Sequence, residues 1–458
     1  MMYKSLNHHY HHLILIIILC ILNVYGQFVP ESRVGHSAVY VESERRIYYI
    51  GGFKSIPTEP ETMSDFFYLD VNIPNLSNLN YLTFSDLKSQ VNLPLSIFHI
   101  SELGGVNKDL IFILEGVHWN DSETNYIYSF NTKTNELSVP IVQGKVPPTR
   151  KGISSVIYEG KIYLFGGHNG ADVDALYYNN FDVFDTINLN WQVGSLINSP
   201  VTRTLYSAIL VNGIIYYIGG KTQVNVYTPL TEIYQYDVVG NTWSLKKATA
   251  ADPMIMPGSR AGHTSILMDG KIIIYGGFFS SDVTPYNLPA KETIAMLDVN
   301  TLVWSIPAFD LRENNPIPKL AFHTATAVNT IMFIAFGNFT DKPNRIDQTN
   351  KIIYAFLFGK SQISSYPLLV FGQTNETQLQ LPTSTNTNIN PQQSLLSKVV
   401  IIGISIGSVS IVLIILAALS IAYKRAKKNK LQLGVPNDQN SLNGVQINDD
   451  KYHSEYQK

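Results

Sequence analysis

Paired short apolar segments recur along most of the chain, and each pair ends in two glycines. Four copies are clear, each with an apolar run, a polar turn and a second apolar run before Gly-Gly. They read GHSAVYVESERRIYYIGGF from Gly35, GISSVIYEGKIYLFGGH from Gly152, LYSAILVNGIIYYIGGK from Leu205 and GHTSILMDGKIIIYGGF from Gly262. The pattern predicts two adjacent β-strands in each unit, because short apolar runs bounded by turn residues are typical of strands.

Two weaker copies fit the same frame and complete a set of six. They read FHISELGGVNKDLIFILEGV, ending at Glu115-Gly116, and FHTATAVNTIMFIAFGN, ending at Phe336-Gly337. Successive units are 51 to 64 residues apart. After three of the double glycines, an Asp stands six residues before a Trp, in the pairs Asp185–Trp191, Asp237–Trp243 and Asp298–Trp304. A period of this length indicates a repeat architecture.

Each unit is predicted to be a small antiparallel sheet of four strands. Its second strand, as in IYLF or IIIY, is apolar at successive positions, which indicates burial on both faces. The double glycine ends that strand where backbone is crowded or φ is positive. The Trp is predicted to pack between adjacent sheets. Six such sheets arranged radially bury both faces of each one, so the predicted fold class is all-β.

These units resemble the kelch repeat. The resemblance covers residues 27–372 and implies a six-bladed kelch-type β-propeller. The first, second and sixth units depart from the pattern at Gly-Gly or Trp, which leaves open the strand that closes the ring. The structural repeat positions are Gly51, Gly52, Gly166, Gly167, Gly219, Gly220, Gly276, Gly277, Trp191, Trp243 and Trp304.

An apolar block near the N-terminus predicts a signal peptide over residues 1–26. The run from Leu13 to Leu22 is only ten residues, about half a bilayer crossing. Lys4 precedes it, and Val24-Tyr25-Gly26 follows as a cleavage site. The alternatives are an uncleaved anchor and a buried strand.

A second apolar block predicts one transmembrane α-helix over residues 399–423. The block carries no charge and is long enough to span a bilayer. Five Lys or Arg residues within 424–430 indicate that residues 424–458 form a cytoplasmic tail. The topology is therefore single-pass type I, with the N-terminus extracellular or lumenal, in the plasma membrane or another membrane of the secretory pathway.

Two further features lie beside this helix. Residues 373–398 are rich in Thr, Asn and Gln and contain no aromatic residue, so they are expected to form a stalk. Gly403 and Gly407 make a GxxxG pair, a motif that is compatible with helix pairing and a homodimer. Such pairs are common in membrane helices, so a monomer is the alternative.

Composition narrows the function. The formal net charge is -2, so no basic footprint for nucleic acid is present. Cys20 is the single cysteine, which excludes a zinc finger, an iron–sulfur cluster and an intrachain disulfide. Kelch propellers include copper-radical oxidases resembling galactose oxidase, whose cofactor needs a Tyr–Cys cross-link. Cleavage after Gly26 would remove Cys20, so that chemistry is not expected.

No catalytic residue, cofactor site or metal site is predicted. The sequence contains no G-x-S-x-G, H-E-x-x-H or P-loop motif. Four histidines recur at one repeat position, where local hydrogen bonding is favoured over metal binding because members of a ring lie too far apart to share a metal. They are His36, His99, His263 and His323.

Four arginines, each three residues before that repeat position, are candidate partner-binding residues. They are Arg33, Arg150, Arg203 and Arg260. The resemblance implies that they face the rim of the central channel and can grip acidic side chains of a partner, which suits the guanidinium fork. The alternative is an inter-blade salt bridge with a nearby Asp or Glu.

Four N-x-S/T sequons precede the predicted membrane helix and are candidate N-glycosylation sites: Asn75, Asn120, Asn338 and Asn375. Together, these features favour a non-enzymatic cell-surface recognition or scaffold protein, whose extracellular propeller binds a protein or glycan. The alternative is a membrane-tethered kelch-type enzyme, either galactose-oxidase-like or sugar-processing.

Overall fold

The computed structural model describes residues 28–54, 61–72, 83–118, 127–170, 175–280, 287–308, 317–342, 349–358 and 363–368. The predicted signal peptide (1–26), stalk (373–398), membrane helix (399–423) with Gly403 and Gly407, and tail (424–458) lie outside these residues. In the described part, the only helix is the short 3₁₀ turn η2 (Pro253–Ile255), and no helix is long and apolar enough to cross a membrane.

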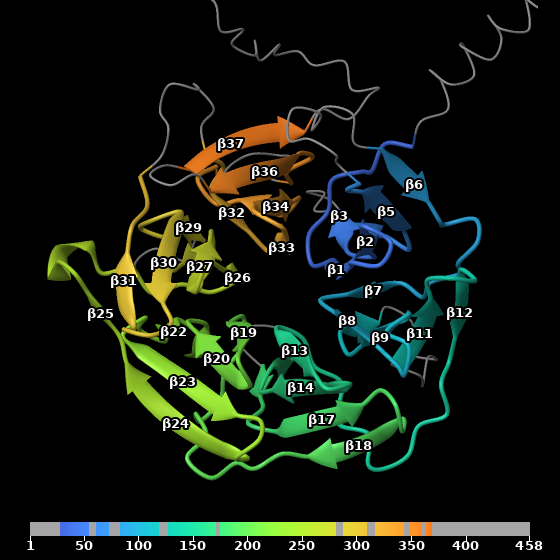
Figure 1. Cartoon of the computed structure of the whole chain (residues 1–458), viewed down its shortest axis with the longest axis horizontal. Helices are drawn as coiled ribbons and strands as arrows, with labels where there is room; N and C mark the ends of the chain where they lie inside the picture. The colour runs from blue at the N-terminus through green and yellow to red at the C-terminus, as the bar shows by residue number, and fades with distance from the viewer. Residues whose placement is uncertain are drawn as a thin grey trace, which may run out of the picture. The chain divides into compact units, whose positions relative to one another are not determined.

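Six antiparallel sheets surround a central axis, as the sequence predicts (Figure 1). Each sheet, or blade, is built from consecutive strands. The blades are numbered in chain order, and the strands of each are given from the axis outward. Blade 1 is β1 (Ser37–Val41), β2 (Arg46–Ile50), β5 (Phe66–Asp70) and β6 (Phe84–Asp86); blade 2 is β8 (Ile100–Gly104), β9 (Leu110–Leu114), β11 (Ile127–Asn131) and β12 (Glu136–Ser138); blade 3 is β13 (Ser155–Tyr158), β14 (Lys161–Phe165), β17 (Phe181–Asp185) and β18 (Asn190–Val193). Blade 4 is β19 (Ser207–Val211), β20 (Ile214–Ile218), β23 (Glu232–Asp237) and β24 (Thr242–Lys247); blade 5 is β26 (Thr264–Met268), β27 (Lys271–Tyr275), β30 (Ile294–Asp298) and β31 (Val303–Ser305); blade 6 is β33 (Thr324–Val328), β34 (Ile331–Ala335), β36 (Ile353–Phe358) and β37 (Ile363–Leu368). A fifth strand, β25 (Thr249–Ala250), pairs in parallel with β31.

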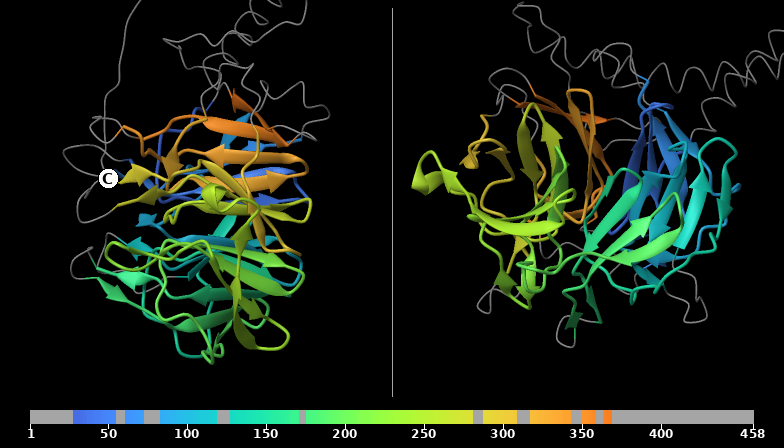
Figure 2. Two further views of the ribbon diagram at one scale, coloured as in Figure 1. Left: turned by 90° about the vertical axis from the view of Figure 1, so that its left-hand side faces the viewer. Right: turned by 60° about the horizontal axis from the view of Figure 1, so that its bottom comes forward.

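The second strand of every blade is buried on both faces, which confirms the interpretation of its continuous apolar run. The buried apolar residues of the described chain gather into six large clusters, one at each boundary between neighbouring blades. The core is therefore a set of layers between blades. Figure 2 shows the blades stacked in this way around the ring.

The double glycines end the second strands where the backbone must turn. All twelve residues of the six pairs have positive φ, and Glu115 and Phe336 adopt it in the two weaker copies. The second position is always glycine. A Cβ atom on Gly277 would lie 2.9 Å from the carbonyl oxygen of Ala261, and one on Gly220 would lie 2.6 Å from that of Thr204. The strand end thus packs against the segment that leads into the innermost strand.

The Asp and the Trp that stand six residues apart after three of the double glycines have separate structural roles. Oδ1 of Asp237 accepts hydrogen bonds from the backbone N–H groups of Val239 and Gly240, and so shapes the turn between the third and fourth strands. The indole N–H of Trp304 donates to the carbonyl of Leu230 in the preceding blade at 2.9 Å. Packing of the Trp between adjacent sheets is therefore confirmed.

The ring closes without an exchange of strands. Blade 1 contains only residues 37–86 of the chain and blade 6 only residues 324–368, and β33 packs directly against β1. Gly337 N–H donates to the Arg33 carbonyl at 2.9 Å across this boundary. Closure within the described residues therefore depends on side-chain packing and a few hydrogen bonds. Where blade 4 meets blade 5 and blade 2 meets blade 3, parallel pairing of the linking chain is added, in β25 with β31 and in the bridge between Gln143 and Asn190.

One face of the propeller carries short hairpins. After each double glycine, the chain pairs with the segment that leads into the innermost strand of the same blade, for example in the bridge between Thr204 and Lys221. The two-stranded pairs on this hairpin face are β3 (Phe53–Lys54) with β4 (Glu61–Thr62), β7 (Ser96–Ile97) with β10 (Val117–His118), β15 (His168–Asn169) with β16 (Leu176–Tyr177), β21 (Lys221–Gln223) with β22 (Val226–Tyr227), β28 (Phe278–Phe279) with β29 (Leu288–Pro289), and β32 (Leu320–Ala321) with β35 (Asn338–Phe339).

Candidate functional site

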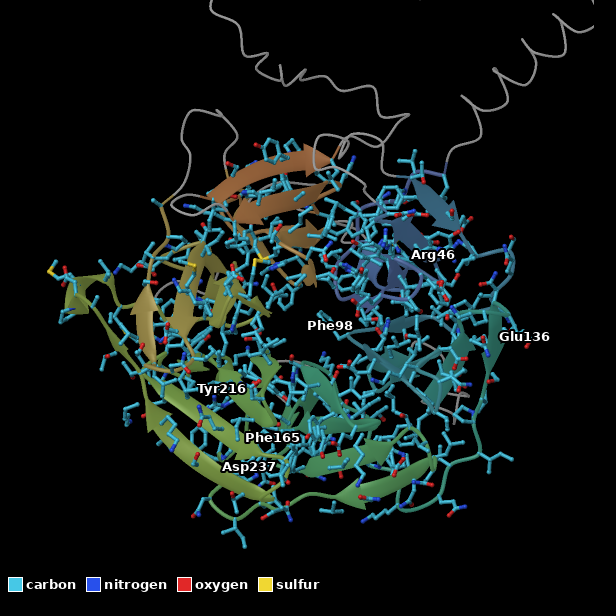
Figure 3. All side chains as sticks on the ribbon, in the orientation of Figure 1. Arg46, Phe98, Glu136, Phe165, Tyr216 and Asp237 are labelled. Carbon is cyan, nitrogen blue, oxygen red and sulfur yellow. The ribbon has the colours of Figure 1, made fainter. Side chains whose placement is uncertain are left out.

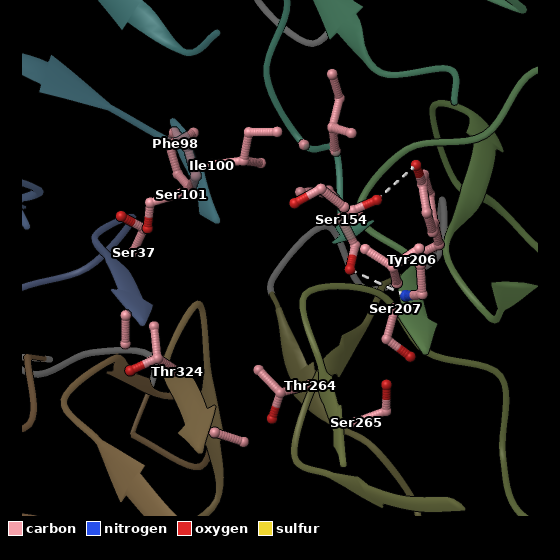
Figure 4. Close-up of a pocket in the computed structure, with 18 of the residues that line it drawn as sticks. Ser37, Phe98, Ile100, Ser101, Ser154, Tyr206, Ser207, Thr264, Ser265 and Thr324 are labelled. Carbon is pink, nitrogen blue, oxygen red and sulfur yellow. Dashed lines mark hydrogen bonds between the residues drawn. The ribbon is translucent and has the colours of Figure 1, made fainter. Parts of the chain in front are cut away.

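The central channel is the larger of two candidate sites. Residues of all six innermost strands and the segments before them line a cavity of about 470 Å³. Figure 4 shows serine and threonine side chains of the innermost strands around it, including Ser37, Ser101 and Thr264. Across one boundary, the Tyr206 hydroxyl donates to the Ser154 carbonyl and Ser154 Oγ accepts from the Ala208 N–H. The channel wall is thus polar and largely uncharged.

A collar of three bulky residues, Phe98, Leu205 and Phe322, narrows the channel at the hairpin face, and Figure 3 shows Phe98 at the edge of the opening. Around the channel, these three residues alternate with Gly35, Gly152 and Gly262. All six residues have positive φ. Five backbone hydrogen bonds of 2.7 to 3.4 Å link neighbours in this ring. A Cβ on Gly35 would lie 3.1 Å from the ring of Phe98, so the small and large residues interlock.

The recurring histidines are structural. Nε2 of His36, His263 and His323 lies 2.8 to 3.0 Å from a hydroxyl of the preceding blade, so these rings bridge blades instead of bonding only to local backbone. Burial lowers the pKa of His323 to about 3 and also lowers that of His36 and His263, so all three are neutral at physiological pH. No group of three or more potential metal-ligating His, Cys, Asp or Glu residues occurs in the described ranges.

Glu102 is the acidic residue in the channel wall. Its Oε1 accepts a hydrogen bond from Ser155 Oγ at 2.7 Å. Burial raises its pKa to about 7, and the Ser155 hydrogen bond partly opposes that shift. Sequence reasoning missed Glu102. The sequence alone did not show which residues of the innermost strand β8 face the channel and which face the neighbouring blades.

The four arginines do not face the channel rim, so the expected position is corrected. Their exposed fractions are only 0 to 2%, and none lines the channel. Arg33 binds Asp65 at 2.8 Å, Arg150 binds Asp182 at 2.5 Å, and Arg260 lies 3.6 Å from Glu292. These three arginines form salt bridges, but the bonds to Asp65, Asp182 and Glu292 lie within a blade. Among the described residues, the inter-blade salt bridge given as the alternative is confirmed only for Arg150, which lies 3.7 Å from Glu115 of the preceding blade.

Arg203 differs from the other three because it contacts no carboxylate in the described chain. Its Nη1 makes two long hydrogen bonds, of 3.5 and 3.4 Å, to the carbonyls of Tyr217 and Gly219. The Tyr234 ring lies 5.1 Å from its guanidinium carbon, and its Nε has no hydrogen-bond acceptor. Burial lowers the pKa of Arg203 to about 10, so the group is a buried cation at physiological pH.

Arg203 lines a second cavity of about 180 Å³ on the hairpin face, here termed the blade-4 pocket. Its other lining residues are Pro200, Val201, Thr202, Thr222, Val226, Tyr227, Thr228, Pro229, Glu232 and Tyr234. A buried cation therefore shares this pocket with several apolar side chains. Sequence reasoning singled out Arg203 but none of these neighbours.

Exposed apolar side chains gather beside this pocket on the hairpins of blades 4 and 5. They form the hairpin surface, defined as Val201, Val224, Val226, Phe279 and Leu288, with exposed fractions of 37 to 74%. The Tyr227 and Phe279 rings lie 4.7 Å apart, and Oη of Tyr227 lies 2.7 Å from Ser280 Oγ, so the two hairpins are joined. Sequence reasoning missed this surface because each of the two hairpins contributes only two of these residues, and Val201 lies before the blade-4 hairpin.

The described ranges contain one of the four sequons. Asn338 lies half-buried in β35, with its backbone paired to Ala321. The Thr340 hydroxyl of the same sequon is buried and donates to the Lys319 carbonyl at 3.1 Å. Asn75, Asn120 and Asn375 lie outside the described residues.

Comparisons with known proteins agree with the repeat and the fold. The profile of the KLHDC2/KLHL20/DRC7 Kelch-repeats domain family matches residues 77–277. Kelch domain-containing protein 3 of Homo sapiens is 25% identical over 256 residues, which cover 54% of this chain and 64% of that protein. Host cell factor 1 of Homo sapiens is 23% identical over 249 residues, or 50% of this chain and 11% of that protein.

A solved structure extends the likeness to the whole propeller. The structure of YjhT has a TM-score of 0.55 at 13% identity and covers 74% of this chain and 99% of its own, which shows the fold alone. The described residues form a six-bladed β-propeller, and residues 77–277 of it match a Kelch-repeat domain, in agreement with the repeat pattern. Kelch propellers are in general domains that bind protein partners.

Proposed function

We propose that the chain is a non-enzymatic recognition protein, anchored by one membrane helix, whose extracellular propeller binds a protein partner through the hairpin surface of blades 4 and 5. The observation that carries the proposal is the joined pair of hairpins with five exposed apolar side chains. Grouped apolar side chains on one face of a rigid body are typical of a protein interface. The membrane part of the proposal rests on the sequence of residues 399–430.

A protein suits this surface better than a glycan does. The exposed residues are Val, Leu and Phe side chains, which offer no hydrogen bonds to sugar hydroxyls. Phe279 and Leu288 are directly opposite one another on the two strands of one hairpin, so both can enter one apolar contact. Oligomerisation through Gly403 and Gly407 would place two such surfaces on one assembly.

The experiment is cell-surface cross-linking with the full chain and two charged variants. Val226→Asp on the hairpin surface is expected to abolish the cross-linked protein band. Val239→Asp is the matched control, since Val239 is 80% exposed in the turn between the third and fourth strands, away from the hairpins. An equal band for wild type and Val226→Asp would refute the hairpin surface as the binding site. A band that disappears on enzymatic deglycosylation of the partner would assign the ligand to a glycan.

A further inference from the structure

Glu102, in the wall of the central channel, is an exception to the repeat. The strand registers place it at the same position as one residue in the innermost strand of each other blade. Four of these five residues are apolar and belong to or pack against the clusters between blades. The five are Val39, Val156, Ile209, Ile266 and Thr326. The packing that builds the propeller therefore does not explain an acid at position 102.

The carboxylate of Glu102 has no cation beside it in the described chain. It accepts the hydrogen bond from Ser155 and makes no ion pair with a described residue. The described residues that line the channel include no Lys or Arg. A charge held away from bulk water is costly unless it is paired. Because Glu102 is partly exposed and lines the cavity, a cation inside the channel can reach it.

Two hydroxyls of the channel wall also lack a partner. Oγ of Ser101, beside Glu102 on β8, and Oγ of Ser265, in blade 5, have no hydrogen-bond partner among the described residues. Figure 4 shows these two serines on opposite sides of the cavity. Since a hydroxyl accepts hydrogen bonds as well as donating them, the wall offers acceptors to an N–H donor in addition to the carboxylate.

The wall on either side of Glu102 is apolar, and its charge is small. Ile100 and Ile157, from blades 2 and 3, line the same cavity of about 470 Å³. A polyamine would bring more positive charge than one carboxylate balances. Calcium needs roughly six to eight oxygen ligands, whereas the described ranges hold no group of three or more potential metal-ligating His, Cys, Asp or Glu residues. The wall therefore suits a cation with one ammonium group and an apolar part.

We propose that the central channel binds a small organic ammonium ion of single charge, held by Glu102. The ammonium group donates hydrogen bonds to the carboxylate, and the apolar part lies against Ile100 and Ile157. Ser155 is a positioning residue, because its hydroxyl holds Oε1 of Glu102 at 2.7 Å. The site is independent of the proposed function, since no residue of the hairpin surface lines the channel.

The test is equilibrium dialysis of the full chain in detergent against radiolabelled amines, each paired with its uncharged alcohol. The pairs are butylamine with butanol, benzylamine with benzyl alcohol, and cyclohexylmethylamine with cyclohexylmethanol. At least one amine is expected to bind saturably, about tenfold or more tighter than its alcohol. Both members of a pair are also measured with detergent alone, which corrects for their uptake by micelles.

Three variants assign the binding to Glu102. Glu102→Gln should bind the amine about tenfold or more weakly, and no better than the alcohol. Glu102→Val introduces the residue found at this position in blades 1 and 3, so it should fold about as stably as the wild type and also lose the preference for the amine. The matched control is Glu136→Gln, which should leave binding unchanged, because Glu136 is exposed on the outermost strand of the same blade (Figure 3).

The pH dependence gives a readout that a purely structural role would not affect. Burial raises the pKa of Glu102 to about 7, so the wild-type affinity for the amine should fall about tenfold or more from about pH 8 to pH 5.5, and that of Glu102→Gln should not. The other titratable groups of the channel wall, and of the strands packed against β8, are His36, His99, His263, His323, Tyr40, Tyr158 and Tyr206.

These groups do not produce the same pH dependence. Burial lowers the pKa of the three histidines that bridge blades, His36, His263 and His323. Burial raises the pKa of Tyr40 and Tyr206, and the charge of Glu159 raises that of Tyr158. His99 is common to the wild type and Glu102→Gln, so the comparison of these two proteins removes its contribution.

Several results would overturn the proposal. One is the absence of saturable binding of any amine below about 1 mM. Another is equal affinity for each amine and its alcohol. Displacement of every amine by about 1 mM calcium chloride would assign the channel to a metal ion instead. If Glu102→Gln and Glu102→Val lower the free energy of unfolding but bind the amine as the wild type does, Glu102 serves only to join blades 2 and 3.

Discussion

Arg150 and Arg203 stand at the same position of neighbouring repeats, but their surroundings give them opposite energetic roles. Arg150 neutralises Asp182 and faces Glu115, and all three side chains are buried. Arg203 makes no ion pair with the described residues and is itself desolvated, and Glu232 acts on it only at longer range. Removal of one partner from a buried ion pair is strongly destabilising, whereas removal of an unpaired buried charge is not.

The first prediction follows at the level of stability. Arg150→Met should lower the free energy of unfolding by about 3–5 kcal/mol, because it leaves buried acids without a cation. Arg203→Met should change it by less than about 1 kcal/mol, because methionine fills similar space and strands no acid. Urea denaturation of both variants measures the difference. Equal losses for the two variants would show that Arg203 has an ion-pair partner.

The buried histidines couple stability to pH. The folded pKa of His323 is about 3, while that of the unfolded chain is about 6.5. Below pH 6.5 the unfolded chain takes up a proton that the folded chain does not, so stability falls as pH falls from 6.5 towards 3. His36 and His263, whose pKa values burial also lowers, add to this loss, and Glu102, whose pKa is raised, opposes it.

His323→Gln isolates one of these contributions. The variant should lose stability less steeply than the wild type between pH 6 and pH 4, by about 1.4 kcal/mol per pH unit, because one proton is no longer linked to unfolding. Denaturation curves at several pH values give both slopes, and the other titrating groups are common to the two proteins. Parallel slopes would mean that His323 is protonated in the folded chain.

At the scale of the element, the double glycine joins the second strand to the hairpin face. Two features favour glycine at position 277. Its φ is 91°, and a Cβ atom there would lie 2.9 Å from the carbonyl oxygen of Ala261. Gly270, in the turn between the first two strands of the same blade, has a φ of 70° but nothing within 4 Å of such a Cβ. A comparison of Gly270 with Gly277 therefore separates the cost of a positive φ from the cost of a close contact with neighbouring backbone.

Alanine at these two positions should give different losses. Gly270→Ala is expected to cost about 1–2 kcal/mol, the usual penalty of a left-handed backbone for a residue with a side chain. Gly277→Ala should cost about 1–3 kcal/mol more, because the strand end must also move away from Ala261. Thermal unfolding of both variants measures the two losses. Equal losses would show that the segment before β26 yields freely.

Sequence patterns defined the blades but not the contacts between them. Gly-Gly and the Asp–Trp pair act within one or two turns of chain, so their spacing sufficed to predict six blades, including those ending at Glu115-Gly116 and Phe336-Gly337. The acid partners of Arg33, Arg150 and Arg260 lie 32 residues further along the chain, on the third strand or just before it. That constant spacing was a usable sequence signal, and Gln235 breaks it for Arg203.

The partner of Glu232 and the hairpin surface depend on contacts that no local sequence pattern indicates. Glu232 faces Lys247 because the two are cross-strand neighbours, and the same sequence would equally allow a bond to Arg203. The hairpin surface arises because blades 4 and 5 each expose a short hairpin and Tyr227 joins them to Ser280. Such features follow from tertiary packing, and the position of the arginines at the channel rim, which the family resemblance implies, is not what this packing gives.

At the scale of the whole molecule, the propeller is a ring of six blades with an apolar boundary between each pair of neighbours. Each has its own apolar cluster, and the boundary between blades 6 and 1 contains Tyr49, Phe67, Phe333 and Phe336. Among the described residues, no strand crosses that boundary, so side-chain packing and a few hydrogen bonds hold blades 6 and 1 together. The ring needs no disulfide between its first and last blades, which agrees with a chain whose single cysteine lies at position 20.

The same cysteine offers a test of the predicted processing and topology. If the signal peptide is removed after Gly26, the mature chain has no thiol, and the denatured, purified protein should react with no maleimide. If residues 1–26 remain as an anchor, one thiol per chain should react. The predicted type I topology places the basic residues at 424–430 in the cytoplasm. A tag inserted after Gln27 should therefore be accessible to antibody on intact cells, and one at the C-terminus only after permeabilisation. One reactive thiol together with a hidden N-terminal tag would overturn the type I arrangement, and with it the extracellular position of the hairpin surface.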